Sequence, residues 1–502
     1  MKKTGLLLGL LIAHTAHAEL KIADIFSNHS VLQQGMDVPV WGTADAGDKV
    51  TVTFNRQSLS TTTDDDGKWK LSLAPMKASY NSSSLVVKSG DDKITLKDVL
   101  VGEVWICSGQ SNMQMAVNRV PKIKELTKKA KHIRSFEVKR TVAFEEQHSL
   151  EGTWKESNPV SAVAFGFAYH LQQQGDVPVG IIHASWGSSG IEAWMPRDMV
   201  ETVPHFKTII EEFDANKEAQ DKIKSILSKN PWSKQDDIFL RRQSNLLYNA
   251  MIHPLSPYAC RGLVWYQGER NCQSMNGMLK QPWFSRNSGM LKYGDTLKAF
   301  IQRYRKQWGN ENMHFLTVML PGYHKPLNTG AEKGHDHPDA HSWAWMRESQ
   351  LKSLELENTG VVNTVDLGDL KDIHPKDKLP IGQRLALLAA RDTIGKDVNA
   401  EGPIMNKVEI KGNKMVVHFD HAKGLKTLDK KDPKAFWITD DSQKWVRATA
   451  SLERGAVTLT ATEISKPLYI RYAFTGKPEV NLVNADGLPA RPFRTDTFSP
   501  KK

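Results

Sequence analysis

Cysteine is scarce in this sequence: its 502 residues include only Cys107, Cys260 and Cys272. So few thiols exclude a small scaffold held together by disulfides. Cys107 lies in an apolar run, and we expect it to pack as a small hydrophobic side chain. Cys260 and Cys272 flank a strand-like segment, and whether they approach closely enough to form a disulfide stays open at this stage.

Long apolar runs and dense basic runs are also missing. Beyond the first residues, no segment offers the roughly 18 uninterrupted apolar residues that a membrane-spanning helix needs, so we expect no membrane insertion. The formal net charge is +11, but no Lys/Arg cluster carries interleaved aromatic residues, which argues against nucleic acid as a partner. The positive charge either favours acidic partners or simply aids solubility.

The N-terminus has the three parts of an export signal in the right order. Lys2 and Lys3 are basic, Gly5–Ala13 is a short apolar run, and Ala16-His17-Ala18 gives the small-x-small pattern of a cleavage site. We therefore expect residues 1–18 to be a signal peptide. The mature protein would be periplasmic or extracellular.

The texture of the sequence predicts three domains. Residues 19–98 consist of short alternating runs separated by turn residues, as in a small antiparallel β-sandwich. Residues 99–403 alternate buried strands with helices, which predicts a doubly wound α/β domain with a parallel sheet. A charged helical stretch at 197–245 is expected to be a surface insertion. Short alternating strands return at 404–502 and predict a second β domain.

A candidate nucleophile follows the buried strand that ends at Cys107. Ser111 stands in Ser108–Met113, and ligand sites in open α/β sheets lie beyond the carboxyl ends of strands. Gly109 permits a tight turn, and the N–H of Ser111 itself can point at a developing oxyanion. An ordinary turn at a strand exit is the alternative interpretation.

A candidate base lies late in the chain. His374 follows the strand-like segment Val361–Val365, so its loop should open at the same sheet edge as Ser111. Serine needs a base to take its proton, and Asp372 is near enough to orient the imidazole. The alternative is a surface loop with a histidine among carboxylates.

Two more loops are expected at this edge. Trp186 and Gly187 lie in a glycine-rich loop after one strand, where backbone N–H groups can approach a ligand. Gln267 and Asn271 follow another strand, and their amides are neutral donors suited to a growing negative charge. We therefore expect these two loops to complete an oxyanion hole beside the Ser111 N–H group.

Together these blocks resemble those of the sialate O-acetylesterases, a branch of the SGNH hydrolases. The resemblance is carried by the segments Gly109–Met113, Trp186-Gly187, Trp265–Asn271 and Asp372–Pro375, and by the flanking segments Val31–Gln34, Pro39–Gly42 and Asn481–Arg494. It implies a flavodoxin-like SGNH-hydrolase domain flanked by all-β domains, with no metal and no cofactor. It also implies hydrolysis of O-acetyl esters on sugars by Ser111, His374 and Asp372. In such a site the oxyanion would be held by Gly187 with Gln267 or Asn271.

Some residues depart from the pattern or extend it. One residue separates Asp372 from His374 where many SGNH enzymes have two, so Asp369 stays open as an alternative partner. Gln110, Trp186 and Arg347 are candidate substrate-binding residues: Trp186 for stacking on a sugar, Arg347 for a substrate carboxylate. Core packing of Trp186 and a helix-surface ion pair of Arg347 are the alternatives.

The leading hypothesis is thus an exported serine esterase that removes acetyl groups from a carbohydrate, most simply an O-acetylated sialic acid. Another acetylated glycan such as acetylxylan is the alternative substrate. A non-catalytic carbohydrate-binding protein is the alternative class.

Overall fold

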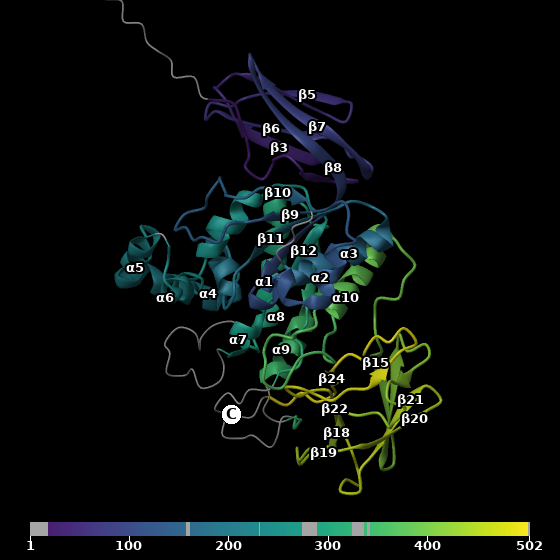
Figure 1. The fold of residues 1–502 in the computed structure, drawn as a ribbon. Helices are drawn as coiled ribbons and strands as arrows, with labels where there is room; N and C mark the ends of the chain where they lie inside the picture. Colours follow the sequence, from purple (N-terminus) through teal and green to yellow (C-terminus); the bar gives the residue numbers. More distant parts are fainter. Residues whose placement is uncertain are drawn as a thin grey trace, which may run out of the picture.

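The computed structural model describes residues 19–156, 161–229, 231–273, 289–323, 336–338 and 342–499. The expected signal peptide at 1–18 lies outside these residues. The chain is a mixed α/β protein in which a largely parallel central sheet stands between two groups of β-strands (Figure 1). Among the described residues, no helix is long and apolar enough to cross a membrane.

The central sheet has the strand order β10-β9-β11-β8-β12-β13-β14, and all its strands except the antiparallel edge strand β10 run in parallel. Their bounds are β8 (Asp92–Gly109), β9 (Ile133–Glu137), β10 (Trp154–Glu156), β11 (Val179–Ser185), β12 (Gly262–Tyr266), β13 (His314–Val318) and β14 (Thr359–Val362). After β8 the chain first builds the sheet on one side and then, from β12, on the other. The carboxyl end of β8 is therefore the topological switch point, where open α/β sheets bind ligands.

Strand β8 joins the N-terminal strands to the central sheet without a break. Its first half pairs with β7 (Ser79–Ser89) and β2 (Val31–Gln33), and its second half, Glu103–Gly109, pairs with β11. The domain boundary predicted between residues 98 and 99 falls inside this one strand. The other N-terminal strands are β1 (Lys21–Ile22), β3 (Val38–Thr43), β4 (Lys49–Phe54), β5 (Gln57–Thr62) and β6 (Lys68–Leu73).

Helices cover both faces of the central sheet. On one face, α3 (Ala162–Gly175) meets α10 (Leu379–Ala389), and the Phe167 ring lies 5.3 Å from that of Trp105 in β8. On the other face, α8 (Tyr293–Trp308) brings Phe300 to 5.0 Å from Trp265 in β12. Apolar side chains project from both faces of the sheet and helices cover them, so every residue of β11 and β12 is buried, as is usual in parallel sheets.

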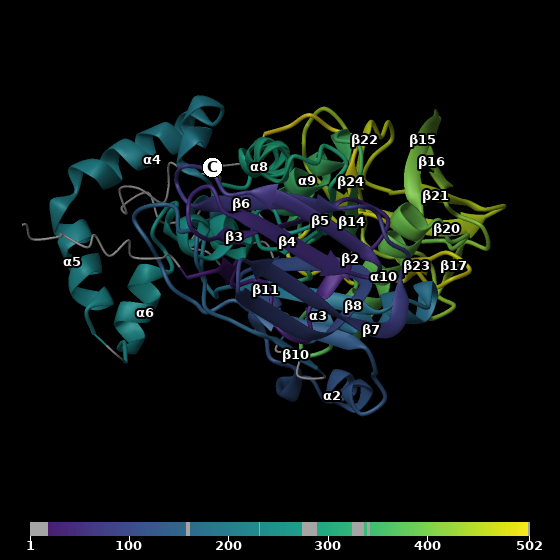
Figure 2. The ribbon, with the colours of Figure 1, turned by 90° about the horizontal axis from the view of Figure 1, so that it is seen from above.

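The predicted insertion is helical and lies to one side of the molecule (Figures 1 and 2). It contains α4 (Pro204–Ala215), α5 (Lys217–Leu227) and α6 (Lys234–Leu240). The smaller helices of the central region are α1 (Ser111–Gln114), α2 (Pro121–Thr127), α7 (Glu269–Gln273) and α9 (Ser342–Leu351).

The C-terminal strands form separate small sheets over a second hydrophobic cluster. They are β15 (Ile404–Lys411), β16 (Lys414–Asp420), β17 (Lys426–Thr427), β18 (Phe436–Thr439), β19 (Val446–Arg447), β20 (Thr449–Glu453), β21 (Ala456–Thr460), β22 (Tyr469–Tyr472), β23 (Leu482–Val483) and β24 (Phe493–Arg494). Arg494 of β24 pairs with Glu348 of α9 at 2.6 Å, which ties this part to the central region.

Candidate active site

The backbone at the switch point presents Ser111 at the end of β8. Gly109 has φ +137°, and a Cβ there would lie 2.1 Å from the Tyr266 carbonyl oxygen, so only glycine fits. The chain turns directly into α1, whose first residue is Ser111. Ser111 is half-buried, so its hydroxyl group is held by the fold but remains accessible.

The predicted nucleophile and base are in hydrogen-bond contact. The Ser111 hydroxyl oxygen lies 2.9 Å from His374 Nε2, although 263 residues separate the two in the chain. On the other side of the ring, His374 Nδ1 lies 3.6 Å from Asp372 Oδ1, which also accepts a hydrogen bond from the His374 backbone N–H at 2.9 Å. Placing the ring proton on Nδ1 leaves Nε2 as the acceptor for the Ser111 hydroxyl.

The surroundings of His374 favour the neutral imidazole. Burial lowers its pKa below the usual 6.5, and the nearby cations of Lys378 and Arg119 lower it further, while Asp372 raises it. A neutral imidazole at neutral pH is what a general base requires.

Asp369, the alternative partner of His374, is occupied elsewhere. Its Oδ1 accepts hydrogen bonds from the backbone N–H groups of Lys371 and Asp372, at 2.8 and 3.0 Å. The contacts of the described residues thus favour Asp372 as the carboxylate beside the imidazole, and give Asp369 the task of shaping the loop.

The Gly187 loop passes directly beside the nucleophile. A Cβ added to Gly187 would lie 3.2 Å from Ser111 Cβ. The Gly187 N–H points into the same space, where it donates to Gln114 Oε1 at 2.7 Å. The Gly187 N–H, which is expected to hold the oxyanion, is therefore hydrogen-bonded to a side-chain amide oxygen in this structure.

Three predicted site residues instead form a buried amide cluster. The Gln267 side-chain nitrogen lies within 3.1 Å of acceptors on Gln110, Ser189 and Asn271, more than its two hydrogens can serve. Asn271 donates to the Glu192 carboxylate at 3.0 Å. Gln110 accepts through Oε1 from Gln267 and from the Arg270 N–H. These side chains hold the loops to each other, and the amides of Gln267 and Asn271, predicted as oxyanion donors, and of Gln110, predicted as a substrate contact, are engaged within the protein in this structure.

Two further substrate-binding predictions are also corrected. The Trp186 indole is buried, stacks on Trp232 at 6.1 Å and donates to Asp237, so no face of it is free for a sugar. Arg347 is 1% exposed, and its guanidinium donates to the carbonyls of Leu320, Thr475 and Gly476. Its task is to hold the C-terminal part against α9, and it is neither a surface ion pair nor a ligand contact.

Several residues near the site escaped the sequence analysis. A buried contact chain under the nucleophile consists of Lys378, Asn112 and Glu269, and half-buried residues near the Gly187 loop are Gln114, Trp232 and Arg242. Asn112 follows Ser111 in its motif, and Glu269 lies in the segment Trp265–Asn271, so the sequence pointed to both. Lys378, Gln114, Trp232 and Arg242 lie outside these segments, and only the fold brings them to the site.

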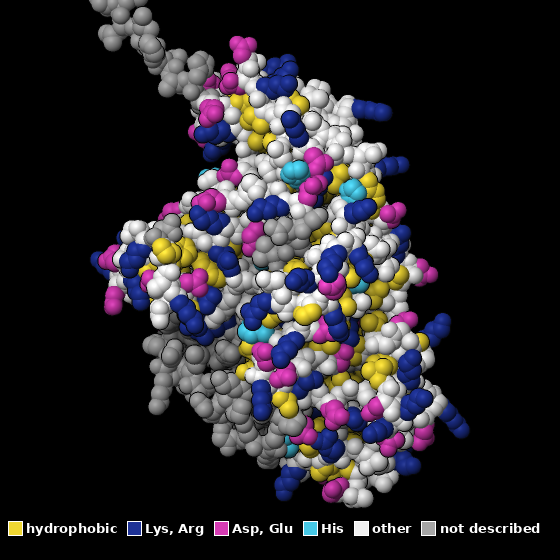
Figure 3. All heavy atoms as spheres, viewed as in Figure 1, with side chains coloured by type: hydrophobic (Ala, Val, Ile, Leu, Met, Phe, Trp, Pro, Cys, Tyr) yellow, Lys and Arg dark blue, Asp and Glu magenta, His cyan; other side chains and the backbone are white. Residues whose placement is uncertain are grey.

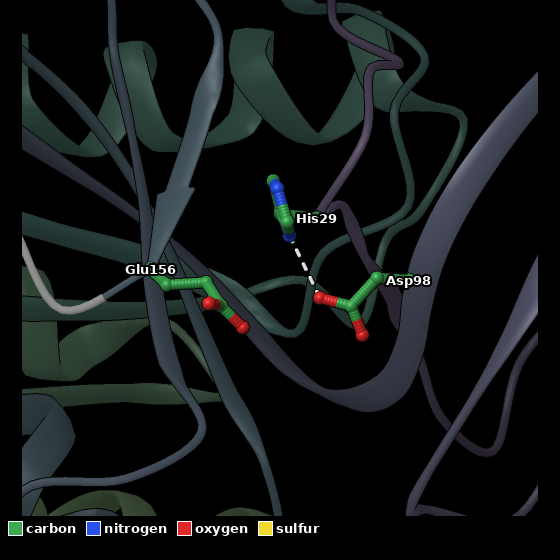
Figure 4. Close-up of side chains that lie close together, drawn as sticks. All are labelled: His29, Asp98 and Glu156. Carbon is green, nitrogen blue, oxygen red and sulfur yellow. Dashed lines mark hydrogen bonds and ion pairs between the residues drawn. The ribbon is translucent and has the colours of Figure 1, made fainter.

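Outside this site, one group of side chains among the described residues has the spacing of a metal site: His29, Asp98 and Glu156 (Figure 4). Asp98 accepts from His29 at 2.7 Å and pairs with Arg134 at 2.8 Å, and Arg134 also lies 3.5 Å from Glu156. Arg134 places one positive charge between the two carboxylates, so the cluster is held together as an ion-pair network.

Two remaining features are the state of the cysteines and the distribution of charge on the surface. Cys107, Cys260 and Cys272 are buried and none of the three is in a disulfide, so the bond left open for Cys260 and Cys272 does not form. On the face seen in Figure 3, lysine and arginine side chains are interleaved with aspartate and glutamate.

Comparison with known proteins gives a consistent result. A family model described as carbohydrate esterase, sialic acid-specific acetylesterase, matches residues 101–232 and 228–390. The sialate O-acetylesterase of Rattus norvegicus is 27% identical over 525 residues, covering 95% of this chain and 94% of its own. That of Homo sapiens is 27% identical over 546 residues, covering 98% and 97%. The crystal structure of a carbohydrate acetylesterase from Xanthomonas citri superposes with a TM-score of 0.79 at 29% identity, covering 95% of this chain and 100% of that one.

Proposed function

Since the chain belongs to the sialic acid-specific acetylesterase family of carbohydrate esterases, and so hydrolyses acetyl esters, we propose that it does so as a serine esterase of the SGNH type acting on O-acetylated sialic acids. The observation that carries this proposal is the 2.9 Å contact between the Ser111 hydroxyl and His374 Nε2 at the switch point of the sheet. The flavodoxin-like description of the central domain and export by residues 1–18 belong to the same proposal.

The reaction is a two-step acyl transfer. His374 Nε2 takes the Ser111 proton as the hydroxyl oxygen attacks the acetyl carbonyl carbon. The imidazolium then gives that proton to the departing sugar oxygen, which leaves an acetyl ester on Ser111. His374 then takes a proton from water as the water oxygen attacks this ester. The bond to the Ser111 oxygen breaks, acetate leaves, and the imidazolium returns its proton to that oxygen. Asp372 stabilises the transient imidazolium from the Nδ1 side.

The oxyanion is held by backbone donors. Ser111 is the first residue of α1, and the first N–H groups of a helix have no partner within it. The second donor is the Gly187 N–H, which is hydrogen-bonded to Gln114 Oε1 in this structure. The entering acetyl oxygen takes the place of that amide oxygen. The fold fixes both backbone donors in place, so only the Gln114 side chain has to move.

An arginine near the site supports an acidic sugar as substrate. Arg242 is half-buried and donates through Nη2 to the Ser188 hydroxyl at 3.1 Å, one residue beyond Gly187. Among the described residues it pairs with no carboxylate, whereas the adjacent Arg241 pairs with Asp237 at 3.2 Å. Burial and the charge of Arg241 lower the pKa of Arg242, and among the described residues no anion pairs with it to offset these effects. The carboxylate of a sialic acid supplies that anion, and neutral acetylxylan does not.

The first experiment tests the serine mechanism. Ser111→Ala removes only the hydroxyl oxygen from a half-buried position, so the protein should fold normally and lose nearly all turnover of p-nitrophenyl acetate. A folded variant that retains turnover contradicts the proposal. Absence of turnover by the parent protein supports the alternative of a binding protein.

The second experiment tests the substrate. The parent protein should release acetate from O-acetylated sialic acid faster than from acetylated xylan. Arg242→Gln should reduce kcat/KM for the sialic acid ester about 10- to 100-fold, the value of a hydrogen-bonded charge, and leave p-nitrophenyl acetate turnover unchanged. Arg241→Gln is the matched control and should leave both activities intact. Equal effects of the two substitutions would contradict the assignment.

A further inference from the structure

A fully buried lysine lies directly beneath the proposed catalytic residues. Lys378, at the N-cap position of α10, is 0% exposed. Its Nζ donates to Asn112 Oδ1 and lies 5.2 Å from the centroid of the Tyr266 ring. An ammonium group is costly to bury, so its retention at this place calls for a function beyond packing.

Asn112 also forms hydrogen bonds with two other loops. Its amide nitrogen donates to Glu269 Oε1 at 2.5 Å and to the Ile373 carbonyl at 3.1 Å. Asn112 is the neighbour of Ser111, Ile373 is the neighbour of His374, and Glu269 begins α7 after strand β12. One side-chain amide therefore joins the three loops that surround the site.

The lysine decides how that amide is oriented. The Asn112 oxygen must face Lys378 for its nitrogen to face Glu269 and Ile373, since an amide has one accepting end and one donating end. Without the lysine, the oxygen would be buried with no partner, and rotation of the amide would break both other bonds. Lys378, Asn112 and Glu269 are called the buried triplet below.

We propose that Lys378 is a positioning residue of the esterase reaction, which holds Ser111 and His374 at attack distance through the buried triplet. This inference rests on the proposed serine mechanism. Lys378 touches neither the serine nor the substrate and acts through Asn112. Misplacement of reacting groups by about 1 Å costs roughly a hundredfold in rate, so a defect in this linkage should lower kcat and leave KM nearly unchanged.

Lys378 also acts on His374 through its charge. The groups that face His374 are Asp372 on its own loop, Arg119 after α1, and Lys378, of which the two cations lower the pKa of the imidazole. Lys378 in turn faces Glu269, Asp372 and Tyr266; burial lowers its own pKa to about 7, against the opposing effect of the two carboxylates. At the acidic pH where His374 takes up its proton, Lys378 is therefore charged. Removing that charge raises the pKa of His374.

The test compares Lys378→Met with Lys376→Met, which makes the same chemical change at an exposed position two residues earlier. Folding is checked by circular dichroism and thermal unfolding. For p-nitrophenyl acetate we expect Lys378→Met to lower kcat about 10- to 100-fold with an unchanged KM, and to move the acid limb of the kcat/KM profile to higher pH. Lys376→Met should match the parent protein.

A folded Lys378→Met variant with parental kcat and an unmoved acid limb overturns the inference. If this variant does not fold, the isosteric Asn112→Asp decides, because it keeps the lysine contact and replaces the donor to Glu269 and Ile373. It should show the same loss of kcat, and parental kcat overturns the inference. Failure of both to fold assigns the buried triplet to stability and also overturns it. Absence of turnover in the parent protein is a different result, since it defeats the proposed function itself.

Discussion

Replacing Asp372 with asparagine tests how much the carboxylate contributes to the proposed reaction. Asparagine has the same shape and still accepts the hydrogen bond from the His374 backbone N–H, so the loop should keep its course. The substitution therefore removes the negative charge 3.6 Å from His374 Nδ1 and little else.

The expected magnitude follows from the distance and the exposure of this pair. The Asp372 side chain is 45% exposed and that of His374 37% exposed, so water screens the interaction. Ion pairs of this kind contribute about 0.2–1 kcal/mol, which corresponds to a loss of at most about fivefold in kcat/KM. A buried triad aspartate with a short bond to its histidine contributes about 10⁴-fold, as in the serine proteases.

The pH dependence has a defined sign. Asp372 raises the pKa of His374, so its replacement lowers that pKa and moves the acid limb of the kcat/KM profile to lower pH. The assay is p-nitrophenyl acetate hydrolysis across this limb, with Asp369→Asn as the matched control that leaves the limb in place. A loss of a hundredfold or more, or an acid limb that moves upward, would refute the reasoning.

Three further predictions concern the loops and the thiols. Gly187→Ala places a methyl group 3.2 Å from Ser111 Cβ. This variant should lower kcat on the order of 10- to 100-fold without changing the unfolding temperature. An unaltered kcat would show that the Gly187 loop is not part of the reacting site. Gly109→Ala sets a Cβ 2.1 Å from the Tyr266 carbonyl oxygen, at a backbone φ of +137°. The substitution should lower the unfolding free energy by roughly 2–5 kcal/mol, measured by denaturant titration. A loss below about 1 kcal/mol would contradict this geometry. Because none of the cysteines is in a disulfide, a reducing agent should leave the thermal unfolding midpoint unchanged, and a drop of several degrees would indicate a disulfide.

The sequence was sufficient to predict where Ser111 and His374 meet. Each follows an apolar strand of a parallel sheet, and the carboxyl ends of such strands share one edge. Within 404–502, where short alternating strands are predicted, the segments Met415–Phe419 and Ala456–Thr460 lie in strands β16 and β21. The alternation of apolar and polar residues along a short strand depends only on neighbouring residues, so it can be found in the sequence without knowledge of the tertiary contacts.

The direction of polar side chains was harder to predict. Gln110, Gln267 and Asn271 stand at strand ends, but their amides point into the protein and hydrogen-bond to each other. The burial of Arg347 depends on carbonyl groups of Thr475 and Gly476, which belong to a different part of the chain. Such contacts are decided by tertiary packing and leave no local pattern.

The buried triplet shows the same limit. Lys378 in a polar loop has the appearance of a surface lysine, and only the approach of Asn112 and Glu269 makes it a buried cation. The predicted boundary at residue 98 lies inside β8, which continues to Gly109. The strand passes from partly exposed to fully buried along its length, and its pairing changes from antiparallel with β7 to parallel with β11 and β12.

The most direct test of the account is covalent labelling of the nucleophile. The protein is treated with a fluorophosphonate, digested, and searched by mass spectrometry for the modified peptide. The account predicts a single adduct on Ser111 that forms in the parent protein and fails to form after His374→Ala, since the imidazole must take the serine proton. An adduct on another residue, or equal labelling of Ser111 without His374, would contradict it.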